Sequence, residues 1–128
     1  MREPTISLPQ LASATPHVRF SADGASFVIH EWRGSGPSSL HVHHADDEAW
    51  HVLEGTLRFR FLDRTVDVPA GGTVFIPAEV PHTYQAIDAR YLIILPPRLD
   101  ALIRELQRTP DREAQVALYR KYDSELLE

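Results

Sequence analysis

Residues 41–51 read His41-Val-His43-His-Ala-Asp-Asp-Glu48-Ala-Trp50-His51. His41 and His43 are two positions apart, and in a β-strand such residues point to the same face. Two imidazoles on one face of a strand form a chelating pair for divalent metals. Glu48 follows after a gap long enough for a turn, so a return strand can bring its carboxylate back to the same space. The stretch therefore predicts a metal site inside a β-structure, with Trp50 lining the same space.

A further histidine stands alone in a second segment. His82 follows the loop-like stretch 77–81 and stands at the head of a strand-like run at 84–87. Tyr84 is two positions further on and shares the face of His82, which makes it a candidate to hydrogen-bond a metal-bound ligand. Plain packing inside the β-structure is the alternative role for Tyr84.

The remaining histidines and the acidic pair of the first segment are predicted to lie outside the site. His44 has the opposite parity to His43 and is expected to face outward or to lie at the barrel mouth. His51 has the opposite parity to Glu48 and is not expected to be a ligand. His17 and His30 are interpreted as ordinary strand residues. The acidic pair at 46–47 is interpreted as a solvated turn.

The surrounding sequence has the pattern of an antiparallel barrel or sandwich. Short β-rich runs at 27–32, 65–68, 73–76 and 91–95 are separated by glycine and proline turns, at the spacing of roughly 8–12 residues expected for such folds. In the run 56–61, apolar and polar residues alternate, which puts Leu57, Phe59 and Phe61 on one face and the arginines on the other. With Trp50 and Tyr84, these three are candidate apolar walls of a small-molecule pocket.

The chain divides into three parts of one predicted domain, residues 1–128. Residues 1–16 are expected to form an extended N-terminal arm, and residues 17–95 a β-barrel. Residues 97–128 are expected to form C-terminal α-helices, because their apolar positions repeat with helical spacing. Thr109 is the expected N-cap of the second helix, with Pro110 at its first position. The helices are expected to pack on the barrel, with a helical partner-binding arm as the alternative.

Composition excludes several classes of function. The chain has 128 residues, a formal net charge of −5 and no cysteine. Disulfides, cysteine metal ligands and cysteine nucleophiles are therefore excluded. No basic stripe favours nucleic acid. No apolar run favours a membrane span, and the first residues lack the pattern of a signal peptide. We expect a cytoplasmic protein.

The stretch 34–87 resembles the cupin superfamily. His41, His43, Glu48 and Gly55 match the first cupin motif in residue type and spacing, although the upstream Gly36 stands one residue too near His41. In the second motif, Gly71, Pro77 and His82 are in register. Glu79 replaces the internal glycine, and Ala86 replaces the terminal asparagine.

The resemblance implies an all-β, cupin-type antiparallel barrel (a double-stranded β-helix or jelly roll) followed by two α-helices. It implies one divalent metal ion per chain, held by His41, His43, Glu48 and His82. Iron, manganese, nickel, copper, cobalt and zinc all fit such donors. Small cupins commonly pair, so a homodimer is expected.

Three functions are compatible with this site. The first is a small-molecule dioxygenase of the quercetin-dioxygenase-like type, with Glu48 as ligand and base, as the resemblance implies, and Tyr84 as a further candidate catalytic residue. The second is a metal-dependent isomerase or lyase, and the third is a non-enzymatic ligand-binding cupin. One carboxylate against a divalent ion leaves about one positive charge, which favours an anionic or enolisable substrate.

Overall fold

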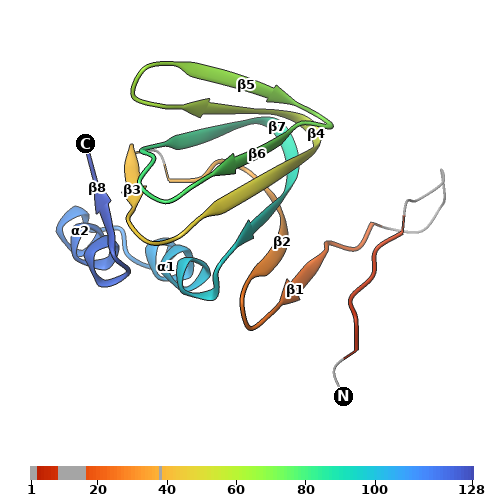
Figure 1. Ribbon diagram of the computed structural model, residues 1–128, viewed down its shortest axis with the longest axis horizontal. Coiled ribbons are helices and arrows are strands. Elements are labelled where there is room, and N and C mark those ends of the chain that lie inside the picture. The colour runs from red at the N-terminus through yellow and green to blue at the C-terminus, as the bar shows by residue number, and fades with distance from the viewer. Residues whose placement is uncertain (1–2, 9–16, 38) are drawn as a thin grey trace.

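The computed structural model describes residues 3–8, 17–37 and 39–128. Eight strands and two helices run along this part of the chain (Figure 1). In order, they are β1 (Ser21–Asp23), β2 (Val28–Arg33), β3 (His41–His43), β4 (Glu48–Arg60), β5 (Thr65–Pro69), β6 (Thr73–Ile76), β7 (Thr83–Leu95), α1 (Pro97–Gln107), α2 (Arg112–Lys121) and β8 (Ser124–Leu126).

The main sheet is built around the two long strands β4 and β7. Its strand order is β1-β2-β7-β4-β5, and β6 pairs with the first half of β4. All of these pairings are antiparallel. The register between β4 and β7 shifts around Gly55, which has a φ of 71°. A Cβ at Gly55 would lie 2.1 Å from the carbonyl oxygen of Asp88, so this close approach of two backbones requires glycine.

A second, two-stranded sheet of β3 and β8 lies beside the main one. His41 of β3 also forms an isolated antiparallel bridge with His82, just before β7. The His41 N–H donates to the His82 carbonyl at 3.1 Å, and the His82 N–H donates back at 2.9 Å. This bridge joins the small sheet to the main one. The architecture confirms the prediction of an antiparallel β-barrel followed by two helices.

The barrel interior is filled as strand parity predicted. Trp50 and Val52 alternate with less buried residues before the register shift at Gly55, Leu57 and Phe59 do so after it, and all four are fully buried. Arg58, between two of them, points outward and pairs with Asp67 of the neighbouring strand. The period of two along one long strand therefore sets both the core and the surface.

The C-terminal part differs from its predicted form in two respects. The N-cap of α2 is Asp111, whose carboxylate accepts from the Ala114 N–H, whereas the Thr109 hydroxyl donates to the carbonyl of Glu105 at the end of α1. An aspartate is the stronger N-cap of the two residue types. Helical structure also ends at Lys121, and residues 124–126 form β8 instead. The prediction that helices extend through residue 128 was wrong, because pairing with β3 overrides the helical pattern.

The predicted N-terminal arm is described only in part, since residues 1–2 and 9–16 lie outside the described residues. Residues 3–8 have no regular secondary structure and are exposed. Among the described residues, no helix is long and apolar enough to cross a membrane.

Candidate metal centre

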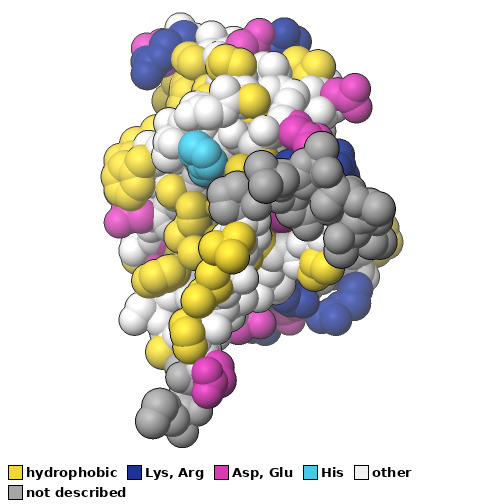
Figure 2. Space-filling model, turned by 90° about the vertical axis from the view of Figure 1, so that its right-hand side faces the viewer, with side chains coloured by type: hydrophobic (Ala, Val, Ile, Leu, Met, Phe, Trp, Pro, Cys, Tyr) yellow, Lys and Arg dark blue, Asp and Glu magenta, His cyan; other side chains and the backbone are white. Residues whose placement is uncertain are grey.

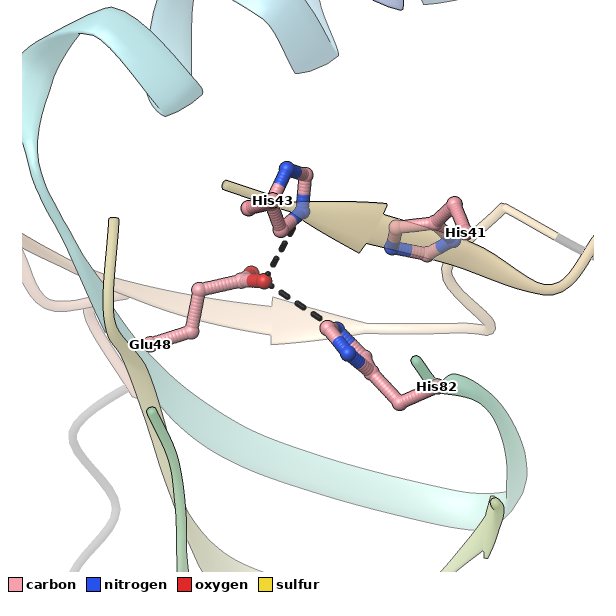
Figure 3. Close-up of side chains that lie close together, drawn as sticks. All are labelled: His41, His43, Glu48 and His82. Atoms are coloured by element: carbon pink, nitrogen blue, oxygen red, sulfur yellow. Dashed lines mark hydrogen bonds and ion pairs between the residues drawn. The ribbon is translucent and has the colours of Figure 1, made fainter. Parts of the chain in front are cut away.

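The four predicted ligands converge inside the barrel (Figure 3). Two histidines come from β3, Glu48 begins β4, and His82 lies just before β7. Each of the four residues is between 2% and 6% exposed. One donor atom from each lies within 4.8 Å of the others. The structure thus brings together His41, His43, Glu48 and His82, as the sequence predicted.

Hydrogen bonds at Nδ1 fix which nitrogen of each ring faces the centre. His41 Nδ1 lies 2.9 Å from the Ser39 carbonyl, and His82 Nδ1 lies 2.9 Å from the Val80 carbonyl. A carbonyl only accepts, so both nitrogens carry a proton. His43 Nδ1 is 2.7 Å from Ser124 Oγ.

Ser124 completes the same arrangement for His43. Its hydroxyl donates to the Tyr122 carbonyl at 3.1 Å, so its oxygen accepts from His43 Nδ1. In all three rings, Nδ1–H therefore donates a hydrogen bond to an oxygen atom outside the ligand cluster. In the neutral rings, every Nε2 lone pair is then free for the centre, which is the tautomer that a metal-binding histidine needs.

Glu48 supplies the negative charge of the centre. Its Oε1 atom lies 3.0 Å from His43 Nε2 and 3.1 Å from His82 Nε2. Burial alone would raise the pKa of Glu48, but the hydrogen bonds from the two imidazoles outweigh it and hold the pKa below its usual range. The carboxylate is therefore ionised at neutral pH.

Its surroundings hold His41 in the neutral form. Burial, with the neighbouring His82 and His43 as smaller causes, lowers the pKa of His41 to about 3. The ring therefore stays unprotonated across the physiological range, and its Nε2 keeps a lone pair for a metal.

A cavity of about 700 Å³ opens onto the centre. This volume suits a small organic molecule. Besides the four ligands, its walls combine barrel strands with the C-terminal helices, including Trp50, Tyr84, Tyr91, Ile93, Leu102 and Tyr119. Trp50 and Tyr84 line it as predicted. Leu57, Phe59 and Phe61 do not. Leu57 and Phe59 pack wholly within the core, and Phe61 borders a separate hollow, so their predicted role as pocket walls was wrong.

Tyr84 is held in a chain of hydroxyls. Its oxygen lies 2.9 Å from the Tyr91 hydroxyl, which donates to the Gly34 carbonyl at 2.8 Å. The Tyr84 proton is therefore directed to Tyr91, and the Tyr84 oxygen is left as an acceptor. The ring packs so closely on Gly36 that a Cβ there would lie 2.4 Å from it, which explains a glycine at this position.

The two departures from the second motif leave the four ligands untouched. Glu79 has a φ of 77°, the left-handed conformation for which glycine is the usual residue. Its carboxylate points away from the centre and contacts His44, with Oε2 3.1 Å from Nδ1. The Ala86 N–H bonds to the Ser35 hydroxyl at 3.0 Å.

Most of the other residues that were predicted to lie outside the site do so. His44 and His51 face outward, and His51 Nδ1 lies 2.8 Å from the hydroxyl of Thr73. His17 pairs with Glu31. Asp47 is exposed as predicted and accepts from the N–H of residue 78, whereas Asp46 is largely covered and pairs with Arg98.

Sequence reasoning missed two residues of the site, Ser124 and Tyr119. Ser124 lies in the segment that was predicted to be helical. Tyr119 of α2 is 2% exposed and lines the cavity, with its ring 5.5 Å from that of His41. Only the position of Tyr119 on a helix that faces the barrel could have indicated this role, and the local sequence does not reveal that position.

Fold and site together define an antiparallel barrel protein with an internal cluster of three imidazoles and one carboxylate that can hold a metal. A family model described as Cupin domain matches residues 27–95, more than half of the chain. The protein therefore belongs to the cupin family. A comparison with curated proteins found no match.

Solved structures show the same fold. A cupin-2 domain protein from Shewanella frigidimarina is 27% identical, with a TM-score of 0.53 over 62% of this chain and 79% of that one. A cupin protein from Bacteroides fragilis is 16% identical, with a TM-score of 0.52 over 68% and 82%. The protein KdgF from Halomonas sp. is 18% identical, with a TM-score of 0.52 over 66% and 81%. At these identities, the last two bear on the fold alone.

Proposed function

We propose that the protein is a metal-dependent dioxygenase that acts on a small, enolisable or anionic molecule. The observation that carries the proposal is the donor set: three Nε2 atoms and one ionised carboxylate converge at the end of a cavity with aromatic walls. Such a set holds a divalent metal and leaves one or two coordination positions for other groups.

The donor set fits a metal on its own geometry. The separations of 3.0 and 3.1 Å between Glu48 Oε1 and its two imidazole nitrogens match neighbouring ligands that each lie about 2.1 Å from one ion. With every Nδ1 proton directed outward, the bonds from Nε2 to Glu48 require extra protons on the rings. A divalent cation supplies the same positive charge without them.

A divalent metal bound there supplies Lewis-acid polarisation of an enolate oxygen and open positions for substrate and dioxygen. Glu48 is the base in this proposal. Both of its imidazole contacts end on Oε1, and no hydrogen bond from another described residue reaches Oε2. Oε2 is thus the oxygen able to take the proton whose loss forms the enolate.

The cavity walls support oxygen chemistry. Trp50, Tyr91 and Ile93 present buried rings and aliphatic groups, which exclude water from a reactive enolate. Tyr84 can accept a hydrogen bond from a substrate hydroxyl, since its own proton is directed to Tyr91. Burial raises the pKa of Tyr84 well above its usual value, so it stays neutral.

The test compares turnover with and without oxygen. Metal-free protein is loaded separately with Fe²⁺, Mn²⁺, Co²⁺, Ni²⁺, Cu²⁺ or Zn²⁺ and incubated with a panel of flavonols and 1,3-diketones. Oxygen uptake and incorporation of ¹⁸O₂ into product are measured. Glu48→Gln tests the base, and His51→Ala is the matched control for an outward imidazole.

The expected result is substrate-dependent oxygen uptake with at least one metal, abolished by Glu48→Gln and unchanged in His51→Ala. Equal turnover under nitrogen would replace the dioxygenase with an isomerase or lyase. Binding of the panel without turnover under any condition would indicate a ligand-binding cupin. Either result would overturn the proposal.

The homodimer stays a prediction. Apolar side chains gather in a band on the face shown in Figure 2. The described part of the arm also exposes Ile6 and Leu8, at 72% and 76%. Exposed apolar groups of this kind suit burial against a second copy. Sedimentation at micromolar concentration checks this, and a 14.5 kDa species would contradict it.

A further inference from the structure

A second cluster of metal-ligand side chains lies apart from the centre described above. It joins the β1–β2 hairpin to helix α1. His30 of β2 and Asp100 of α1 are buried, at 4% and 7% exposed, and Asp23 at the end of β1 reaches them from the surface. One donor atom from each lies within 4.8 Å of the others. From the sequence alone, His30 is an ordinary strand residue, and nothing near it in the sequence points to Asp100.

Two buried atoms in this cluster have no hydrogen-bond partner among the described residues, namely His30 Nε2 and Asp100 Oδ1. They lie 3.3 Å apart, yet their geometry is not that of a hydrogen bond. Asp23 Oδ1 is 3.6 Å from the same nitrogen. A buried polar atom without a hydrogen-bond partner lowers stability. A cation bound between His30 Nε2 and Asp100 Oδ1 would give both atoms a partner.

Neighbouring groups orient the donors toward this point. His30 Nδ1 is 2.8 Å from the hydroxyl of Ser21, its direct partner across the β1–β2 ladder. When this Nδ1 donates to Ser21, Nε2 presents a lone pair. Arg104 Nε donates to Asp100 Oδ2 at 2.9 Å, which fixes that carboxylate and leaves Oδ1 facing His30.

We propose that His30, Asp23 and Asp100 form a second binding site for a divalent transition metal ion, of which Zn²⁺ is the representative. Zinc takes imidazole nitrogen and carboxylate oxygen at about 2.0–2.2 Å in tetrahedral sites, which places neighbouring donors about 3.3–3.6 Å apart. The separations of 3.3 and 3.6 Å from His30 Nε2 to the two carboxylates lie within that range. Two carboxylates, one of them paired with Arg104, leave a net negative charge, which favours a cation. Water completes the coordination.

The role of this ion is to pin helix α1 to the barrel. Asp100 belongs to the helix, while His30 and Asp23 belong to the hairpin, so the three donors meet only when the helix is docked. Leu99 and Leu102 of α1 are both 1% exposed and form part of the core. The ion therefore ties a cavity-covering element to the sheet. This proposal does not depend on the dioxygenase.

The experiment counts Zn²⁺ per chain by isothermal titration and equilibrium dialysis. Wild-type protein is compared with the His41→Ala/His43→Ala variant, which removes ligands of the first centre only. Asp23→Asn is then added to both backgrounds. The Asp23 side chain is 70% exposed and its contact is with His30, so this change leaves the core intact. Asp63→Asn, at an exposed carboxylate paired with Arg64, is the matched control.

Wild-type protein should bind two ions per chain, and the double-histidine variant one. Asp23→Asn should weaken the remaining ion at least about tenfold, because it removes one of three ligands, while Asp63→Asn changes nothing. Zn²⁺ should also raise the melting temperature of the double-histidine variant, an effect that Asp23→Asn removes. One ion in wild type, or equal affinity with and without Asp23→Asn, would overturn the second site. If the double-histidine variant does not fold, the number of ions bound by wild-type protein and the effect of Asp23→Asn on wild-type protein still test the second site.

Discussion

His43 and Ser124 are 81 residues apart in the sequence, yet His43 Nδ1 and Ser124 Oγ lie 2.7 Å apart in the barrel. The two residues are direct partners in the β3–β8 ladder. The C-terminal strand therefore sets the orientation of a ligand ring in the candidate metal centre. Partners of this kind fix the tautomer and direction of a metal-binding imidazole.

Ser124→Ala should weaken metal binding at the first centre by about 10–100-fold, since it frees the ring of His43 and removes the acceptor of its Nδ1 proton. Chelator competition measures the affinity. Ser26→Ala, at an exposed serine of the turn before β2, is the control and should leave the affinity unchanged. Unchanged affinity in Ser124→Ala would show that the hydroxyl does not orient the ligand.

His82→Ala should cause a sharper loss of metal from the first centre than Ser124→Ala, because it deletes a ligand donor rather than its support. Elemental analysis of protein dialysed against a weak chelator measures the loss. His51→Ala removes an outward imidazole whose Nδ1 lies 2.8 Å from the Thr73 hydroxyl, and should retain wild-type metal content. Full metal content in His82→Ala would exclude His82 as a ligand.

Glu79→Gly should raise the free energy of unfolding by up to about 1 kcal/mol and leave the metal content unchanged. Glycine adopts the φ of 77° without the steric cost that Glu79 incurs, and the exposed contact with His44 contributes little. Urea unfolding gives the comparison. Glu79→Gln, which keeps the backbone strain, should not be stabilised. Loss of metal in Glu79→Gly would mean that Glu79 supports the centre.

Gly55→Ala should lower the free energy of unfolding by about 2 kcal/mol or more. The new methyl group would meet the backbone of Asp88 at 2.1 Å, in addition to the strain of a positive φ. Gly71→Ala separates the two effects, since Gly71 has a φ of 91° with open space around it, and it should cost only about 1 kcal/mol. Equal losses in the two variants would show that the close approach carries no cost.

The pKa of His44 should lie above its ordinary value of 6.5, because its ring is hydrogen-bonded to the Glu79 carboxylate. The folded pKa is the higher one, so this pair stabilises the fold fully below pH 6.5, and the contribution disappears as pH rises through the folded value. Glu79→Gln should bring the pKa down toward 6.5 in an NMR titration. Glu125→Gln, at the longer distance of 3.5 Å, should lower it less. No change in either variant would contradict the assignment.

The parity of residues along strands predicted much of the site. The spacing of His41 and His43, and the alternation along 48–60, hold because each is local to one or two strands. Glu48 was predicted from the length of the turn before it, and His82 from the match to the family motifs, which encode where the chain returns. Turn spacing and alternation predicted an antiparallel barrel or sandwich, and the resemblance to cupins selected the barrel.

The parts that sequence reasoning missed depend on distant pairing. Ser124 belongs to a strand of three residues that pairs with the distant strand β3, so no local pattern indicates it. His30 looks like any strand residue until helix α1 brings Asp100 against it. Leu57 and Phe59 have the expected parity, but the barrel interior is divided between core and cavity, and parity alone does not locate that boundary.

The backbone bridge between His41 and His82 bears on how this scaffold can evolve. The bridge is made by N–H and C=O groups, so any residue except proline can occupy either position without breaking it. The side chains are free to change while the two segments stay joined. Single substitutions at these two positions can therefore alter or remove the metal ligands during evolution, while the barrel keeps its structure and can acquire another function.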